Sequence, residues 1–185
     1  MNSFLDKFFR WERFRKIIKH IPRNSIVCDI GCGKEGVLLN KISKFIKYGV
    51  GFDKNIENKK KEKYELVKLE ILEEIPEEKE TYNIVTVVAV LEHLLNPEEI
   101  LKESHRILKK NGKLILTTPT PLAKPILEFL ALKLKLIDRN EMEDHKNYFW
   151  PKDVKKILLK VGFKEQNIKI NYFEFFLNGL IVAQK

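Results

Sequence analysis

The sequence has few cysteines and lacks any long hydrophobic run. Its two cysteines, Cys28 and Cys32, lie close together with no histidine or further cysteine nearby, which excludes a zinc site of ordinary ligand spacing. No export signal begins the chain, so we expect both thiols to be reduced and the protein to be cytoplasmic. No apolar stretch reaches the roughly 18–20 residues of a membrane-spanning helix, so no transmembrane segment is expected.

Acidic residues are outnumbered by basic ones, which gives a formal net charge of +9. An excess of basic residues can indicate a nucleic-acid partner. Here the lysines are spread along the chain and interleaved with glutamates, with the densest basic run, KKKEK, at residues 59–63. This distribution favours an ordinary solvated surface, of the kind also found in heat-adapted proteins, and leaves a nucleic-acid surface as the alternative.

The length of 185 residues predicts one domain, residues 1–185, with no repeat and no linker. Strand-like and helix-like segments alternate, which predicts an α/β fold with a parallel sheet. The expected strands cover residues 25–30, 48–53, 64–70, 82–90 and 113–118, followed by two strands around Asn178-Gly179. The expected helices cover residues 4–21, a segment after the glycines at 31–36, 97–110 ended by Asn111-Gly112, 121–137 and 151–161.

The most informative segment is VCDIGCGKEG, residues 27–36, where a predicted strand gives way to a helix. It contains G-x-G-x-x-G, a weak pattern that also occurs in dinucleotide sites. A dinucleotide would place a pyrophosphate at the helix N-terminus, where the carboxylate of Asp29 would repel it. S-adenosylmethionine carries an ammonium and a sulfonium and no phosphate, so Asp29 would be a favourable partner, and the glycines would let the backbone approach it.

Asp53 ends the second predicted strand, and a carboxylate there can accept hydrogen bonds from both ribose hydroxyls of an adenosine ligand. NAD and S-adenosylmethionine share this ribose, so Asp53 does not discriminate between them. Two simpler interpretations stay open: Asp53 can cap the next helix, and Asp29 can be a buried structural acid.

The segments around Asp29 and Asp53 resemble those of the class I S-adenosylmethionine-dependent methyltransferases. VCDIGCG and the acid that ends GFD carry the first part of the resemblance, and further segments match at the family's separations. These segments are EILEEIP (70–76), YNIVTVVAVLEHL (82–94), RILKKNGKLILTTP (106–119), HKNYFW (145–150) and Gly162-Phe163. The last two resemble the small-molecule branch that includes ubiquinone-biosynthesis type enzymes. The resemblance covers about residues 25–184. It implies a Rossmann-like, seven-stranded, mostly parallel sheet with helices on both faces and a C-terminal antiparallel strand.

The resemblance also implies cofactor contacts at ten positions. The methionine part of the cofactor would lie among Asp29, Gly31, Cys32 and Gly33. Asp53 would bind the ribose, with Lys54 beside it, and Glu70 and Ile71 would flank the adenine. Val88 and Ala89 would lie beneath the cofactor. Many relatives space their glycines as G-x-G-x-G, whereas Gly36 comes one residue later here. The loop is therefore expected to bulge, and no contact is assigned to Gly36.

A methyltransferase would transfer a methyl group from S-adenosylmethionine to an acceptor and leave S-adenosylhomocysteine. We expect the acceptor, which the sequence does not identify, to be a small molecule, and we expect no metal. If the acceptor must lose a proton, His93 and His145 are the candidate bases. Each histidine is also compatible with a structural role in its loop, and Glu92-His93 can instead anchor the segment after the fourth strand.

Two segments are predicted to cover the site. Residues 119–150 are rich in leucine and aromatic residues, which suits an apolar acceptor or a helix that simply packs on the sheet. The amphipathic N-terminal helix, within residues 1–22, is predicted to be a cap, and peripheral contact with a membrane is the alternative. Four functional hypotheses remain: a small-molecule methyltransferase, an RNA methyltransferase or nucleic-acid-binding protein, an NAD-dependent oxidoreductase, and a cofactor-binding protein without catalysis.

Overall fold

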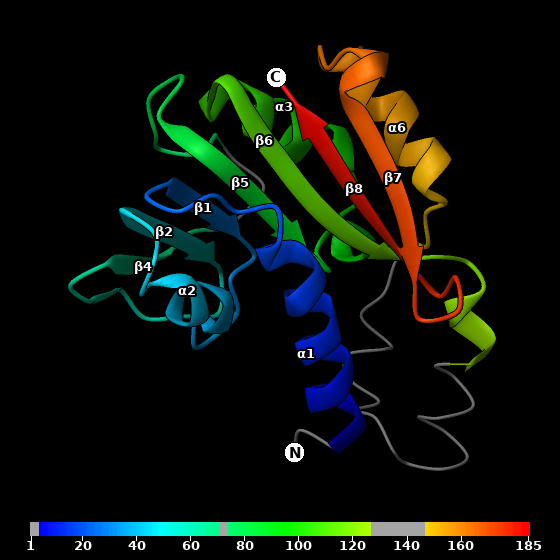
Figure 1. The fold of residues 1–185 in the computed structure, drawn as a ribbon, viewed down its shortest axis with the longest axis horizontal. Helices are drawn as coiled ribbons and strands as arrows, with labels where there is room; N and C mark the ends of the chain where they lie inside the picture. Colours follow the sequence, from blue (N-terminus) through cyan, green and yellow to red (C-terminus); the bar gives the residue numbers. More distant parts are fainter. Residues whose placement is uncertain (1–3, 71–73, 127–146) are drawn as a thin grey trace.

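The computed structural model describes residues 4–70, 74–126 and 147–185, which form one sheet with helices packed on it (Figure 1). The helices are α1 (Phe4–Ile18), α2 (Val37–Ile42), α3 (Pro97–Ile107) and α6 (Pro151–Lys160), with the short 3-10 helices η1 (Leu91–His93) and η2 (Glu165–Asn167). The strands are β1 (Ile26–Ile30), β2 (Tyr48–Asp53), β3 (Lys59–Lys60), β4 (Tyr64–Lys68), β5 (Tyr82–Val88), β6 (Leu108–Pro119), β7 (Ile168–Phe173) and β8 (Asn178–Gln184).

The strands of the described residues follow the order β3-β4-β2-β1-β5-β6-β8-β7 across the sheet. The five strands from β4 to β6 run parallel, while β8 pairs antiparallel with both β6 and β7. This arrangement confirms the predicted Rossmann-like α/β fold with its antiparallel C-terminal strand. The structure adds one strand that was not predicted, the two-residue β3, which lies within the KKKEK run. It pairs antiparallel with β4.

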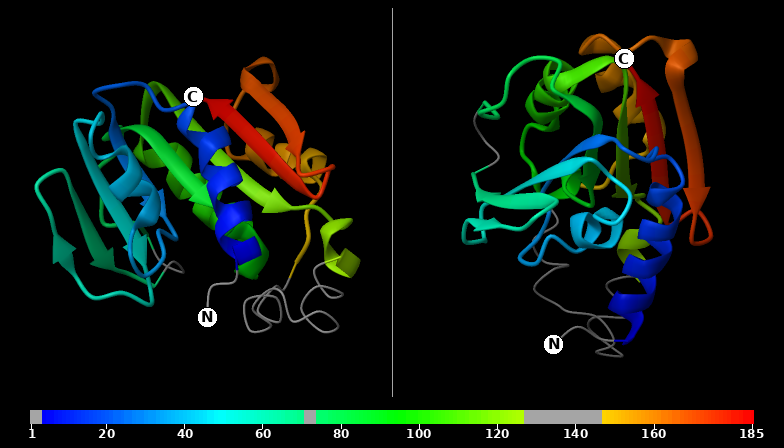
Figure 2. Two further views of the ribbon diagram at one scale, coloured as in Figure 1. Left: turned by 60° about the horizontal axis from the view of Figure 1, so that its bottom comes forward. Right: turned by 60° about the vertical axis from the view of Figure 1, so that its left-hand side comes forward.

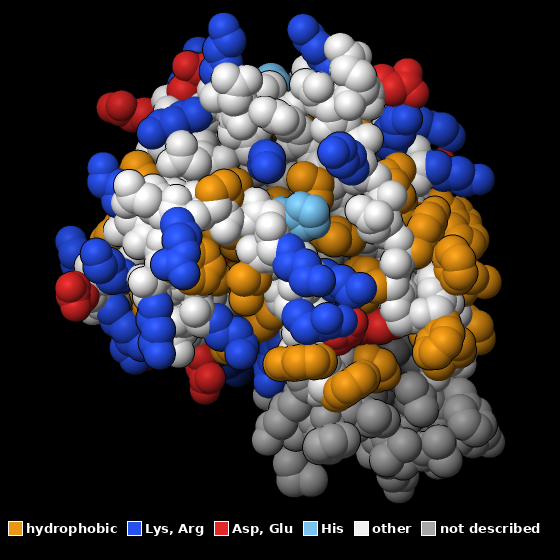
Figure 3. Space-filling view, viewed as in Figure 1, with side chains coloured by type: hydrophobic (Ala, Val, Ile, Leu, Met, Phe, Trp, Pro, Cys, Tyr) orange, Lys and Arg blue, Asp and Glu red, His pale blue; other side chains and the backbone are white. Residues whose placement is uncertain are grey.

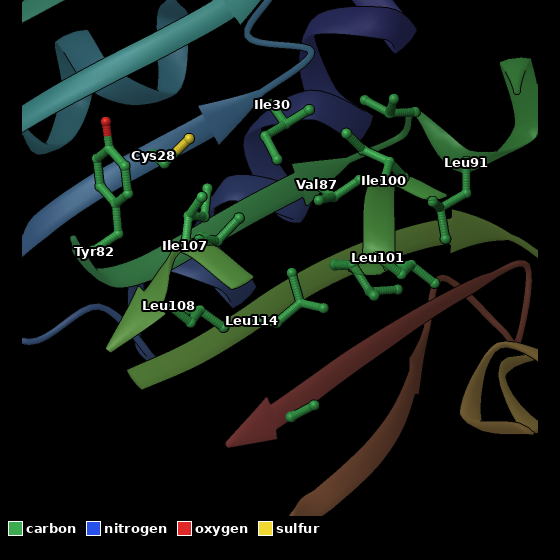
Figure 4. Close-up of a cluster of buried hydrophobic side chains, with 14 of the residues drawn as sticks. Cys28, Ile30, Tyr82, Val87, Leu91, Ile100, Leu101, Ile107, Leu108 and Leu114 are labelled. Atoms are coloured by element: carbon green, nitrogen blue, oxygen red, sulfur yellow. The ribbon is translucent and has the colours of Figure 1, made fainter. Parts of the chain in front are cut away.

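Helices cover both faces of the sheet (Figure 2). A hydrophobic core lies between the sheet and the helices on each face. One face carries α3 and α6, whose residues Ile100, Leu101, Val154 and Leu158 pack against the central strands; Figure 4 shows part of this core around Cys28, Ile107 and Leu114. The other face carries α1 and α2. None of the described helices is both long enough and apolar enough to span a membrane.

Two predicted boundaries are wrong. The helix that begins at Pro97 ends at Ile107, and residues 108–112 already belong to β6. Asn111 adopts a left-handed conformation inside the strand, with a φ of 65°, so Asn111-Gly112 makes an irregularity in β6 and does not end a helix. Likewise, Asn178-Gly179 lies in β8, and the turn before it is made by Glu174, Phe175 and Phe176, all with positive φ.

Arg106 of α3 fixes the segment that leads into β5. Its guanidinium donates hydrogen bonds to the carbonyl oxygens of Ile75 and Glu77, each at 2.8 Å, and to the carboxylate of Glu103. The Glu103 carboxylate also accepts a bond of 3.0 Å from the backbone N–H of Ile75. One side chain therefore joins a helix to a segment about 30 residues earlier in the chain.

We expect Arg106→Leu to lower the free energy of unfolding by about 2–3 kcal/mol, because two carbonyls and a carboxylate lose a charged donor together. Urea denaturation followed by circular dichroism measures the change. Lys155→Leu is the matched control, since its ion pair with Glu165 is exposed on the glutamate side and should contribute less than about 1 kcal/mol. Equal losses in the two variants would contradict the role assigned to Arg106.

Candidate functional site

The candidate site lies at the carboxyl ends of β1, β2 and β5. Because β1 pairs in parallel with both neighbours, the residues that follow these three strands come to one edge of the sheet. Open α/β sheets bind their ligands at this edge. Asp29 near the end of β1 is aligned with Gly51 of β2 and with Thr86 of β5.

The loop after β1 is held by two hydrogen bonds to β2. The backbone N–H groups of Gly31 and Cys32 both donate to the carbonyl oxygen of Phe52, at 2.8 and 3.1 Å. Gly31 and Gly33 have φ values of 74° and 69°, a conformation that L side chains rarely adopt. A Cβ at Gly31 would lie 2.2 Å from Val90, whereas a Cβ at Gly33 would meet nothing within 4 Å. Gly33 is therefore the glycine that faces open space.

Asp53 links the end of β2 to this loop. One carboxylate oxygen accepts a hydrogen bond of 2.9 Å from the N–H of Gly33, and the other accepts one of 2.8 Å from the N–H of Asn55. The backbone donors of Gly31, Cys32 and Gly33 are thus all bonded within the protein. A pyrophosphate needs such donors to be free, so this loop is poorly suited to a dinucleotide.

Asp29 is a buried acid with only 2% of its surface exposed. Its carboxylate accepts a hydrogen bond of 2.6 Å from the hydroxyl of Thr86. Burial raises the pKa of Asp29 to about 7, the bond from Thr86 opposes this shift, and the negative charge of Asp53 adds to it. Among the described residues Asp29 has no ion pair with lysine or arginine. This acid is therefore ready to pair with a cationic ligand.

Other features of the loop serve packing. Gly36 precedes α2 with a φ of 55°, and a Cβ there would lie 2.5 Å from Leu66 of β4. A Cβ at Gly51 would lie 2.8 Å from the sulfur of Cys32, so the Cys32 side chain points into the core between α2 and β2. These close contacts bring the helix onto the sheet, the role of the third glycine in similar turns.

The end of β5 closes the other side of the site. Ala89 has a φ of 54°, which is strained for a residue with a Cβ, and its N–H donates to the carbonyl oxygen of Thr117 at 3.1 Å. The chain then turns into η1, where Glu92 is 1% exposed and burial raises the pKa of its carboxyl. The carbonyl oxygen of Glu92 accepts a bond from the N–H of Asn147 at 3.1 Å. A buried acid thus follows the strained residue.

Comparison with known families decides the identity of this arrangement. A family model described as "Methyltransferase domain" matches residues 2–167, most of the chain. The chain belongs to this methyltransferase family. The glycine turn, Asp53 and the segment after β5 all lie within the matched range.

Individual relatives of this methyltransferase domain are distant. A ubiquinone biosynthesis O-methyltransferase from Aliivibrio fischeri strain MJ11 is 26% identical over 154 residues, which cover 77% of this chain and 65% of the relative. The chain therefore spans somewhat less than two thirds of that relative's length. A solved S-adenosylmethionine-dependent methyltransferase from Archaeoglobus fulgidus has a TM-score of 0.69 at 20% identity, covering 96% of this chain and 93% of its own. Another from Mesorhizobium loti has a TM-score of 0.70 at 12% identity, covering 95% and 97%. These likenesses show that the fold is that of class I methyltransferases.

The methyltransferase fold brings Asp29, Gly31, Gly33 and Asp53 together, as their positions in the sequence predict. Four more of the predicted cofactor residues surround them. Lys54 and Glu70 are exposed beside the site, and Val88 and Ala89 are half-buried at the end of β5. The side chain of Cys32, which was also predicted to contact the cofactor, is part of the core. His93 is half-buried in η1. Ile71 and His145 lie outside the described residues.

Thr86 is a site residue that the sequence did not single out. Its hydroxyl holds the Asp29 carboxylate and lies 3.2 Å from the carbonyl oxygen of Cys28. The available signal was a fully buried hydroxyl residue in an otherwise apolar stretch, IVTVV, of a central strand. A buried hydroxyl requires a partner, and the register of β5 with β1 supplies one.

Proposed function

We propose that this methyltransferase domain transfers a methyl group from S-adenosylmethionine to a small-molecule acceptor. The observation that carries the proposal is the pair Asp29 and Asp53 around a loop in which the N–H groups of residues 31–33 are already bonded within the protein. Two acids favour a cation, and the internal bonding of these three donors disfavours a phosphate. S-adenosylmethionine meets both conditions, because it has an ammonium and a sulfonium and lacks phosphate.

Each residue then has a role toward this cofactor. Asp29, held by Thr86, would attract the ammonium of the methionine part, and the bare backbone at Gly33 would allow close approach. Asp53 would accept hydrogen bonds from the ribose, with Lys54 and Glu70 beside the adenosine. When bound, S-adenosylmethionine supplies a methyl group already activated by positive sulfur. The protein's own contribution is to orient the acceptor and exclude water, which can supply about 7–11 kcal/mol.

Isothermal titration calorimetry with S-adenosylmethionine, S-adenosylhomocysteine and NADH tests the proposal. We expect the first two to bind and NADH not to bind, because a pyrophosphate would face Asp29 and find the N–H groups of residues 31–33 already bonded within the protein. Binding of NADH in preference to both sulfur compounds would overturn the assignment and support an oxidoreductase.

A nucleic-acid acceptor is the second candidate, favoured by the net charge of +9. Binding to RNA through this charge would weaken steeply as the salt concentration rises. Methylation of RNA that survives at physiological salt would replace the small-molecule acceptor with RNA and leave the cofactor assignment intact.

Proton release provides a further prediction. With the pKa of Asp29 near 7, the free protein holds this carboxyl mostly protonated at about pH 6, and a bound cation lowers its pKa. Binding of S-adenosylmethionine should therefore release close to one proton at about pH 6 and almost none at about pH 8, so affinity should rise with pH up to about 7. Calorimetry in two buffers of different ionisation enthalpy measures the released protons.

Asp29→Asn is the control for this measurement, since it keeps the size of the side chain and removes the titration. The same proton count in the wild type and in Asp29→Asn would assign the release to another group.

The stability of the free protein should fall as pH rises, whereas the affinity for S-adenosylmethionine should rise. The native state binds more protons than the unfolded chain between about pH 4 and 7, so this carboxyl makes folding less favourable as pH rises through that window.

A further inference from the structure

Unpaired polar atoms gather beside the proposed cofactor site. Within the part of the chain that the structure describes, five buried side-chain atoms have no hydrogen-bond partner, and they belong to Arg13, Glu92, Thr117, Glu174 and Asn178. A buried polar atom without a partner typically costs about 1–3 kcal/mol. Native proteins contain on the order of a few such atoms per 100 residues, and each one calls for an explanation, such as a ligand that satisfies it.

Strand alternation places two of these residues under α1. Leu180 of β8 packs in the same core cluster as Phe14 and Ile17 of α1. Asn178 lies two residues before Leu180 on the same strand, and Thr117 of β6 is directly opposite Leu180. Since side chains alternate between the faces of a sheet, Thr117 and Asn178 both face α1.

Arg13 connects this face to two acids. Its positive charge lowers the pKa of both the Glu92 and the Glu174 carboxyls, although burial has the larger effect and raises both. The charge of Arg13 therefore reaches Glu92 after β5 and Glu174 in the turn between β7 and β8, and among the described residues it does so without an ion pair of 4.0 Å or less to either acid. The remaining charged neighbours are His93, near Glu92, and Glu12, near Glu174.

Figures 1 and 3 agree that α1, the end of β5 and the turn between β7 and β8 lie at one end of the sheet. In Figure 1 helix α1 runs alongside the ends of β5 and β6, and the β7–β8 turn lies at the same end of the sheet. In Figure 3 basic side chains over α1 adjoin a small acidic area on the side toward β7. Asn178 also donates a hydrogen bond to the second carboxylate oxygen of Glu174, which fixes that acid against β8.

We propose that Arg13, Glu92 and Glu174, with Thr117 and Asn178, form the site that recognises the methyl acceptor, and that the acceptor offers it a hydroxyl or amine group. Three of the five unpaired atoms, on Glu92, Glu174 and Asn178, are oxygens that accept hydrogen bonds, the Nε of Arg13 donates, and the hydroxyl of Thr117 can do either. The site therefore suits a group with N–H or O–H bonds and repels a carboxylate or phosphate. This inference rests on the proposed function, since an acceptor has meaning only beside a methyl donor.

Three compounds with the same four-carbon skeleton test the inference: butylamine, 1-butanol and butanoate. Each is added to the intact 15N-labelled protein saturated with S-adenosylhomocysteine, and shifts in the NMR signals of Glu92, Glu174 and the Asn178 side-chain amide are followed. We expect saturable shifts with butylamine and butanol and none with butanoate. The net charge of +9 would by itself favour butanoate, so the expected order cannot arise from the overall charge.

Variants separate recognition from stability. Glu174→Gln and Glu92→Gln should each weaken butylamine binding about tenfold or more, the effect of losing a charged acceptor. Arg13→Met should strengthen butylamine binding, because the guanidinium of Arg13 competes with the ammonium of butylamine for Glu92 and Glu174. A purely structural cluster would not give opposite signs. Glu165→Gln is the matched control, an exposed acid paired with Lys155 elsewhere on the surface.

The outcomes distinguish this inference from the proposed function. If S-adenosylhomocysteine does not bind, the proposed function fails and this inference falls with it. If S-adenosylhomocysteine binds but none of the three compounds shifts the cluster signals, or butanoate shifts them most, the acceptor site is wrong while the cofactor site stands. Glu174→Gln, at a half-buried position in a turn, keeps the test open if Glu92→Gln does not fold.

Discussion

Replacing Gly31 with alanine is expected to lower the free energy of unfolding by about 2–4 kcal/mol, the largest stability change among our predictions. Two effects add. The φ of 74° is unfavourable for a residue with a Cβ, and that Cβ would lie 2.2 Å from a methyl group of Val90. Both the glycine loop and the start of η1 would have to shift. Denaturant unfolding measures the loss.

Gly33→Ala is the informative comparison. Its φ of 69° gives a similar backbone cost, but a Cβ there meets nothing within 4 Å. Gly33→Ala should therefore cost only about 1 kcal/mol of stability while weakening S-adenosylhomocysteine binding, because the new methyl group occupies the space left for the ligand. If Gly31→Ala were no less stable than Gly33→Ala, the contact with Val90 would not be as tight as described.

Asp53→Ala is expected to produce the largest loss of cofactor affinity, about 100-fold or more for S-adenosylmethionine and S-adenosylhomocysteine alike. Two losses combine: the charged acceptor proposed for the ribose, at about 1.5–3 kcal/mol per hydrogen bond, and the bond that holds the N–H of Gly33 in place. Stability should fall by only about 1 kcal/mol, because the released N–H groups of Gly33 and Asn55 can turn to water. Calorimetry gives the affinity.

Asp53→Asn refines this test. It keeps one oxygen that can accept from Gly33 and removes the charge, so its affinity should fall between those of the wild type and Asp53→Ala. Asp153→Ala, which removes an exposed ion pair with Lys156 on α6, should leave binding unchanged. An unaltered affinity in Asp53→Ala would remove Asp53 from the cofactor site.

The sequence predicted most of the strands and their mostly parallel arrangement well because its signals are local and strong. β1, β2 and β5 are short, largely apolar runs; Gly31 follows β1, and the charged residues Asp53 and Lys54 mark the end of β2. The parallel pairing of β1 and β2 brings Asp29 and Asp53 to one edge, so the meeting of these two residues at the proposed cofactor site followed from the order of the elements.

Features that depend on contacts between distant segments were not predicted. The bond from Thr86 to Asp29 depends on the register of β5 with β1, and the two residues are 57 positions apart. The cluster around Arg13 requires α1, η1 and the β7–β8 turn to meet, and no spacing along the chain encodes that meeting. Asn178-Gly179 is a common turn signal, but the positive φ of Glu174, Phe175 and Phe176 placed the turn four residues earlier.

The outermost strands of the described sheet are β3 and β7. β3 is only two residues long, and both of them, Lys59 and Lys60, are exposed. β7 carries a further exposed lysine, Lys169, in its first half. Edge strands that are short or carry lysines are poor templates for a strand of another molecule, because pairing with the same edge of a second copy would bring lysines together. Crowded solutions of this protein should consequently resist fibre-like association even though its interior strands are strongly apolar.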